Sequence, residues 1–117
     1  MDQKSKEKLK GVDERLVQVA ELAFQLSPIT FRVTEGLRTK ERQQELYAKK
    51  LSKTLNSKHI TGKAFDVVIL RDGKAIWDIK DYKALAVYFK EAAKQLNVKI
   101  ECGADWGWDG PHIELKD

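Results

Sequence analysis

The sequence has few of the features that cross-link a protein or anchor it in a membrane. Cys102 is its only cysteine, so no disulfide can form within the chain, and nothing indicates an oxidising compartment. No apolar run approaches the roughly 18 residues that a membrane-spanning helix needs, so we expect no membrane insertion. The N-terminal stretch MDQKSKEKLKG is polar and lacks the apolar core of a secretory signal. We therefore expect a protein made in the cytoplasm without a signal peptide.

The modest length and the basic charge limit the architecture and the partners. A chain of 117 residues fits a single domain with one small core, and we expect a monomer. A net charge of +4 could attract nucleic acid, membrane headgroups or another anionic polymer. The lysines are dispersed and no nucleic-acid motif is present, so we expect no nucleic-acid partner. The alternative, a basic nucleic-acid-binding domain, would bind DNA in a salt-dependent manner even without metal.

Helical spacing of apolar residues predicts amphipathic helices at Val12–Leu26 and from about Asp81, a candidate cap, to Asn97. A third helix, Lys40 to about Lys50, is mostly polar and can be capped by Thr39. The residues before Gly11 are expected to form a loose start.

Short alternating or β-branched runs predict several strands, joined by turns rich in glycine. They are Ile29–Thr34, Ala64–Leu70, Ala75–Trp77, Val98–Cys102 and His112–Leu115. The Asp72-Gly73 pair predicts a tight hairpin, and Trp77 is expected in the core. Together the patterns predict an α+β fold in which about three helices pack on a small, mostly antiparallel sheet.

Both histidines lie in segments that also carry acidic residues. Asp66 interrupts an otherwise apolar strand, and its burial would be costly unless a divalent cation or an arginine compensates the charge. His59 precedes that strand across Gly62, and His112 begins the last strand. Two imidazoles and one carboxylate form a donor set typical of catalytic zinc, which leaves a fourth position for water. The alternative for His59 taken alone is an ordinary histidine of a surface loop.

The residues around His112 complete the candidate site. His112 and Glu114 are two apart on a strand and so share one face. Asp109 precedes His112 across Gly110-Pro111, a turn that would bring its carboxylate near the metal as a general base for the attacking water. The alternative for Asp109 is a simple turn residue.

Cys102 leaves two interpretations open. A lone cysteine in a chain with two histidines could form a nucleophile pair or supply a sulfur ligand to zinc. The alternative, a small apolar residue that ends a strand, is the one we favour.

These motifs resemble those of a known group of enzymes. The pattern Ser57-x-His59-x-x-Gly62-x-Ala64-x-Asp66, followed by Asp109-x-x-His112-x-Glu114, resembles the LAS-type zinc peptidases, a group that includes lysostaphin, the D-Ala-D-Ala peptidases and the hedgehog signalling domain. Phage endolysins of the L-alanyl-D-glutamate peptidase type are the most similar branch. Their N-terminal signature is matched by Thr34-Glu-Gly-Leu-Arg-Thr39, Arg42-Gln43, Glu45-Leu-Tyr-Ala48, Ser52-Lys-Thr54 and Asn56-Ser57. The likeness extends from about Ile29 to the end of the chain.

The resemblance implies roles for particular residues. His59, Asp66 and His112 would be the ligands of Zn²⁺, and Asp109 the catalytic base. Arg38 would polarise the scissile carbonyl or stabilise the developing oxyanion, unless it only forms a structural salt bridge with Glu35 or Glu41.

Four further residues would surround the metal. Ser57 would lie near the site without acting as a nucleophile, and Glu114 would hydrogen-bond a ligand histidine. Trp106 and Trp108 would either form a wall of the substrate groove or belong to the core.

The function implied is that of a bacteriolytic phage endolysin. A single zinc peptidase domain, residues 1–117 with no separate wall-binding domain, would hydrolyse the L-alanyl-D-glutamate bond of the peptidoglycan stem peptide. It would act on the cell wall after release from the host cytoplasm. One alternative is a D-Ala-D-Ala carboxypeptidase or dipeptidase of the same fold. Another is a non-catalytic, zinc-stabilised binding module, which the presence of both Asp109 and Arg38 disfavours.

Overall fold

The computed structural model describes residues 1–52, 54–55 and 57–116, and in these ranges it contains a five-stranded sheet with helices. The strands are β1 (Phe31–Glu35), β2 (Ala64–Arg71), β3 (Lys74–Ile76), β4 (Ile100–Cys102) and β5 (His112–Leu115). The helices are α1 (Gln3–Lys8), α2 (Glu14–Leu26), α3 (Lys40–Ala48), the 3₁₀ helix η1 (Lys58–Thr61), α4 (Ile79–Leu96) and α5 (Gly103–Trp106). The strand order is β1-β2-β5-β4 with β3 beside β2, and each of these pairings is antiparallel. The predicted α+β fold is confirmed.

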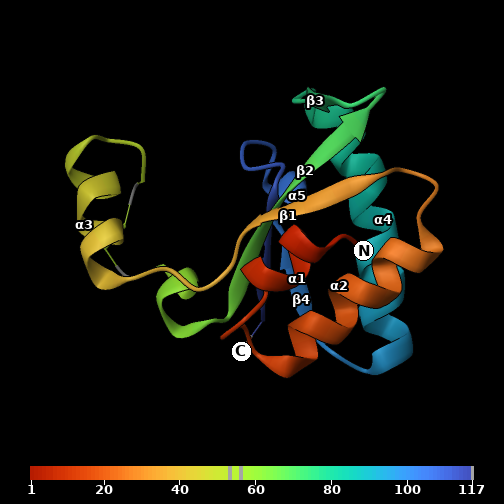
Figure 1. Ribbon diagram of the computed structural model, residues 1–117, viewed down its shortest axis with the longest axis horizontal. Helices are drawn as coiled ribbons and strands as arrows, with labels where there is room; N and C mark the ends of the chain where they lie inside the picture. The colour runs from red at the N-terminus through yellow and green to blue at the C-terminus, as the bar shows by residue number, and fades with distance from the viewer. Residues whose placement is uncertain (53, 56, 117) are drawn as a thin grey trace.

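The hydrophobic core lies between one face of the sheet and the two long helices, α2 and α4 (Figure 1). Phe89 of α4 is fully buried, with its ring 5.1 Å from that of Phe31 on β1 and 5.8 Å from that of Phe65 on β2. Because side chains alternate along a strand, Phe65 and Val67 face this core while Asp66 faces the other way. The polar site therefore lies on the face of the sheet away from α2 and α4.

The N-terminal segment is ordered, which corrects the prediction of a loose start. Asp2 caps α1 by accepting a hydrogen bond from the backbone N–H of Ser5, at 2.8 Å. The fully buried Ser5 hydroxyl in turn accepts a hydrogen bond from the backbone N–H of Val33 at 2.9 Å. The prediction failed because this helix is stabilised by contacts with a distant strand and not by an apolar stripe of its own.

Other local predictions need correction as well. Helix α4 is capped by Asp78 and not by Asp81, which instead pairs with Arg71 at 3.0 Å. Trp77 is 67% exposed and stacks on Tyr82, so it is not a core residue. The short helix α5 lies between the predicted strands Val98–Cys102 and His112–Leu115, where no helix was predicted. The hairpin at Asp72-Gly73 is confirmed, with positive φ at both residues.

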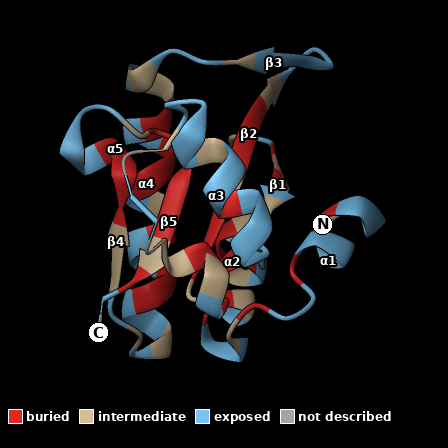
Figure 2. Cartoon of the chain, turned by 90° about the vertical axis from the view of Figure 1, so that its left-hand side faces the viewer, coloured by how far each residue is buried: buried red, intermediate tan, exposed pale blue. Residues whose placement is uncertain are grey.

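Helix α3 lies on the side of the sheet away from α2 and α4, separated from the other helices (Figure 1). Most of its surface is exposed in Figure 2, as its polar sequence predicts. Thr39 caps it, as predicted, by accepting a hydrogen bond from the backbone N–H of Arg42 at 3.1 Å. None of the helices in the described part of the chain has the length and apolar character that crossing a membrane requires.

Candidate metal centre

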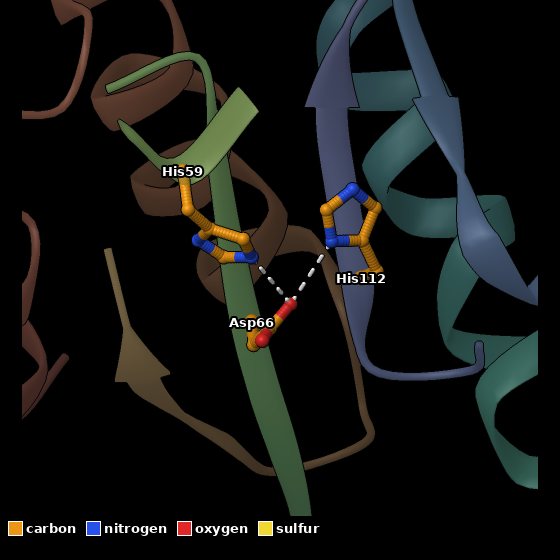
Figure 3. Close-up of side chains that lie close together, drawn as sticks. All are labelled: His59, Asp66 and His112. Carbon is orange, nitrogen blue, oxygen red and sulfur yellow. Dashed lines mark hydrogen bonds and ion pairs between the residues drawn. The ribbon is translucent and has the colours of Figure 1, made fainter. Parts of the chain in front are cut away.

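Strand pairing and one short helix bring His59, Asp66 and His112 together. Asp66 on β2 is the direct cross-strand partner of His112 on β5, so both side chains project from the same face of the sheet. His59 lies in η1, immediately before β2 in the chain. Its Nε2 lies 3.2 Å from Asp66 Oδ1, and His112 Nδ1 lies 3.1 Å from the same oxygen (Figure 3). One ligand atom from each residue lies within 4.8 Å of the others.

The nitrogen that each histidine turns toward Asp66 is determined by what its other nitrogen contacts. His59 Nδ1 lies 2.9 Å from the carbonyl oxygen of Gly36, which can only accept, so Nδ1 carries a hydrogen and Nε2 of the neutral ring has a lone pair. His112 Nε2 lies 2.9 Å from Glu114 Oε1, which likewise leaves the Nδ1 lone pair toward Asp66. Such partners usually accompany metal-bound imidazoles.

Two local features hold these partners in position. Ser57 caps η1 by accepting a hydrogen bond from the backbone N–H of His59 at 3.2 Å, so its hydroxyl helps to place that residue. Lys58 forms an ion pair with Glu114 at 3.0 Å and also donates to the carbonyl oxygen of Leu115. Sequence reasoning missed Lys58, because nothing in its local pattern shows that it reaches β5.

The electrostatics of the cluster suit a cation. Burial by itself would raise the pKa of the Asp66 carboxyl, but hydrogen bonds to His112 and His59 outweigh it and hold that pKa well below its ordinary value. Burial likewise disfavours a charged His112, yet Asp66 and then Glu114 raise the pKa of this imidazole. The cluster therefore attracts positive charge at its centre. The three residues could hold a metal ion, and two imidazole nitrogens with one carboxylate oxygen form a donor set that is compatible with Zn²⁺.

Asp109 lies half-buried in the turn before β5 and lines a groove that the three candidate ligands also line. Its carbonyl oxygen accepts a hydrogen bond from the backbone N–H of His112 at 3.2 Å. That carbonyl packs so closely on Gly103 that a Cβ at that position would clash with it. Burial, the largest influence, raises the pKa of the Asp109 carboxyl, against the lowering effect of His112. A carboxylate with a raised pKa is a better proton acceptor than an ordinary one.

Arg38 lies at the edge of the cluster with only 9% of its side chain exposed. Its Nε donates to Glu35, so one of the two predicted salt bridges is present, and its Nη2 lies 3.9 Å from Asp66 Oδ2. A third partner is Gln43 of α3, whose Oε1 accepts from Arg38 Nη1 at 2.6 Å. The guanidinium is thus held beside the metal ligands as well as being paired.

A groove of about 710 Å³ runs over these residues. Besides the three candidate ligands it is lined by Glu35, Arg38, Leu46, Lys50, Leu51, Ser52, Thr54, Ser57, Lys58, Trp106, Trp108, Asp109 and Glu114. Trp106 and Trp108 line the groove and are 37% and 62% exposed, so neither is a core residue, and their rings are 5.5 Å apart. The Trp106 ring also lies 5.5 Å from that of His112.

Cys102, the candidate nucleophile, lies away from the groove. Lys53 and Asn56, which belong to the N-terminal signature, lie outside the described residues. Cys102 is buried at the end of β4, where burial raises the pKa of its thiol to about 12. It does not line the groove, so it is the strand-ending apolar residue and not a nucleophile or a ligand.

Known proteins resemble this chain in sequence and in fold over nearly its whole length. Residues 1–116 match a family model described as phage L-alanyl-D-glutamate peptidase. The L-alanyl-D-glutamate peptidase of Escherichia phage T5 is 34% identical over 128 residues, which cover 95% of this chain and 93% of that protein.

Solved structures include proteins of similar fold. The crystal structure of Serratia marcescens L-Ala D-Glu endopeptidase ChiX matches with a TM-score of 0.92 and 39% identity, over 99% of this chain and 89% of that one. The vancomycin resistance D,D-dipeptidase VanXYg, in complex with a D-Ala-D-Ala phosphinate analog, matches with a TM-score of 0.55 and 16% identity, over 89% of this chain and 50% of that one. At that identity the second match concerns the fold alone.

Proposed function

The chain belongs to the phage L-alanyl-D-glutamate peptidase family, and we propose that it is a zinc-dependent endopeptidase that hydrolyses the L-alanyl-D-glutamate bond of the peptidoglycan stem peptide. The observation that carries the proposal is the grouping of His59, Asp66 and His112 on the floor of a groove that also contains Asp109 and Arg38. Residues 1–117 form the catalytic domain in this proposal, and the substrate is the stem peptide of the cell wall.

The metal would be held by His59 Nε2, a carboxylate oxygen of Asp66 and His112 Nδ1. When bound there, zinc supplies Lewis acidity, which makes water a nucleophile near neutral pH. The hydrogen bonds from His59 Nδ1 to Gly36 and from His112 Nε2 to Glu114 keep both coordinating lone pairs directed inward.

Asp109 is the proton-transfer group in this proposal. Its carboxylate accepts the proton of the attacking water and then returns it to the amine of the departing D-glutamate residue. Its raised pKa favours the first transfer, and the close packing of its backbone on Gly103 limits its movement.

Arg38 and the groove walls position the substrate. The Arg38 guanidinium is a permanent positive charge that can stabilise the scissile carbonyl oxygen as negative charge develops on it. An extended peptide can lie along the groove, whose lining includes Trp106, Trp108, Ser52, Thr54 and Ser57.

The test pairs metal analysis with digestion of purified peptidoglycan, followed by mass spectrometry of the released ends. The wild type is expected to bind one zinc and to release new amino-terminal D-glutamate. The His112→Ala variant should lose the metal, whereas Asp109→Asn should retain it and lose activity. New ends at D-alanine would instead indicate a D-Ala-D-Ala peptidase, and zinc binding without any cleavage would indicate a binding module. A wild type that binds no metal would refute the mechanism.

A further inference from the structure

The buried side of α3 consists of a single polar residue. Gln43 is the one buried residue of this helix, with no exposed surface, although its sequence neighbours Arg42 and Gln44 are exposed. By contrast, the buried residues of the long helices α2 and α4, such as Leu16 and Phe89, are mainly apolar. A buried amide stabilises a fold only when its hydrogen-bonding groups are used, so the contacts of Gln43 are informative.

Gln43 joins two parts of the groove by hydrogen bonds. Its carbonyl oxygen accepts from Arg38 Nη1 at 2.6 Å. Its amide nitrogen donates to Ser52 Oγ at 2.8 Å and to the carbonyl oxygen of Thr54. Arg38 lies beside the metal ligands, whereas Ser52 and Thr54 line the groove at the end of α3. A glutamine has one acceptor and two donor hydrogens for these three contacts.

The chemistry of the amide suits the neighbouring guanidinium. The Arg38 guanidinium also contacts the carboxylates of Glu35 and Asp66, and each of them partly neutralises its charge. A neutral amide oxygen directs the guanidinium without adding a negative charge. Loss of the Gln43 contact would leave the guanidinium paired with these two carboxylates, and that of Asp66 is a proposed metal ligand.

We propose that Gln43 is a positioning residue that holds the Arg38 guanidinium toward the reacting carbonyl and fixes the Ser52 and Thr54 side of the groove to it. The inference rests on the proposed function, because Arg38 contributes to the reaction only if the groove binds a scissile peptide. Gln43 itself touches neither metal nor substrate.

Three variants separate the two connections that Gln43 makes. Gln43→Met keeps a similar volume and removes both of them. Gln43→Glu keeps an acceptor for Arg38 but lacks the donor for Thr54. Gln44→Met is the matched control, since it makes the same substitution at the adjacent exposed position of the same helix.

For each variant and the wild type, kcat and KM on a soluble stem-peptide substrate are measured together with zinc content and melting temperature. Gln43→Met is expected to lower kcat about 10- to 100-fold with zinc content unchanged, the range typical of residues that orient an active group. Gln43→Glu should also lower kcat, because a third carboxylate beside Arg38 further neutralises the guanidinium, and it should raise KM as well, because the donor to Ser52 and Thr54 is lost. In an Arg38→Lys background Gln43→Met should lower kcat little further, since both changes remove the same interaction. Gln44→Met should resemble the wild type.

A second readout does not depend on catalysis. The Arg38 Nη1–H hydrogens, which donate to Gln43, should exchange with solvent faster in NMR spectra of Gln43→Met than in those of the wild type or of Gln44→Met. Unchanged kcat and unchanged exchange in a folded Gln43→Met variant would overturn the inference, while cleavage by the wild type would leave the proposed function intact. Equal losses of kcat from Gln43→Met in the Arg38 and Lys backgrounds would also overturn it. If the wild type cleaved nothing, the proposed function would fail, and the exchange rate would still decide whether Gln43 holds Arg38.

Discussion

Removal of the Glu114 carboxylate should weaken metal binding without unfolding the protein. Glu114 Oε1 lies 2.9 Å from His112 Nε2, and its other oxygen pairs with Lys58 at 3.0 Å. The Glu114 side chain is only 13% exposed, so little water is available to replace it. In a Glu114→Ala variant His112 would lose the acceptor that keeps its Nδ1 lone pair directed at the metal.

The size of the effect follows from this geometry. Loss of a hydrogen-bond partner of a metal-bound histidine typically lowers affinity about 10- to 100-fold, which corresponds to about 1.4 to 2.7 kcal/mol. Glu114→Gln, which keeps an acceptor but not the charge, should fall between the wild type and Glu114→Ala. Lys58→Met should have a smaller effect, because Lys58 acts on His112 only through Glu114.

The assay is competition for zinc with a chromophoric chelator at a fixed pH, with circular dichroism as a check on folding. Glu101→Ala is the matched control, because Glu101 on β4 is the direct cross-strand partner of Glu114 and is likewise partly exposed. This control should bind zinc at least as tightly as the wild type. A folded Glu114→Ala variant with wild-type affinity would refute the reasoning.

Three more outcomes are expected. Gly103→Ala should lower activity while zinc remains bound, because the added Cβ would clash with the Asp109 carbonyl oxygen and shift the proposed base; wild-type kinetics would contradict this. The Cys102 thiol should resist a thiol-reactive dye at pH 8 in the native protein and react at once in denaturant, since burial raises its pKa to about 12; rapid native labelling would show that the site opens. Asp2→Ala should destabilise the protein by about 1 kcal/mol at pH 7, measured by urea unfolding, because Asp2 caps α1. Hydrogen bonds from Ser5 lower the pKa of the Asp2 carboxyl to about 2, so this stabilisation is fully present above the unfolded pKa of about 3.9 and is lost as the pH falls toward about 2. The stabilities of the wild type and the variant should therefore converge at low pH. A difference that persisted at pH 2 would mean that the cap acts without its charge.

Local patterns were sufficient to predict most elements of the fold but not their caps and surroundings. The apolar stripes of α2 and α4 and the alternation in β5 were readable because each element buries one face. The exposure of Trp77 and the ordering of α1 were not readable, since both depend on which distant segments pack nearby. Asp78 and Asp81 are both plausible caps by residue type, and only the start of α4 in three dimensions distinguishes them.

The sequence alone was enough to predict His59, Asp66 and His112 as the candidate donor set, because two histidines and an aspartate within a specific motif leave few other assignments, and the structure places the three residues together. It also placed His112 and Glu114 on one face of a strand, since side chains alternate strictly along an extended chain. That Asp66 lies opposite His112 could not be read from the sequence, because antiparallel register depends on the packing of the whole sheet. The same holds for the burial of Gln43, whose partners Arg38, Ser52 and Thr54 lie on either side of α3 in the sequence. Gln43 makes these contacts because a buried amide must find hydrogen-bond partners wherever the fold provides them.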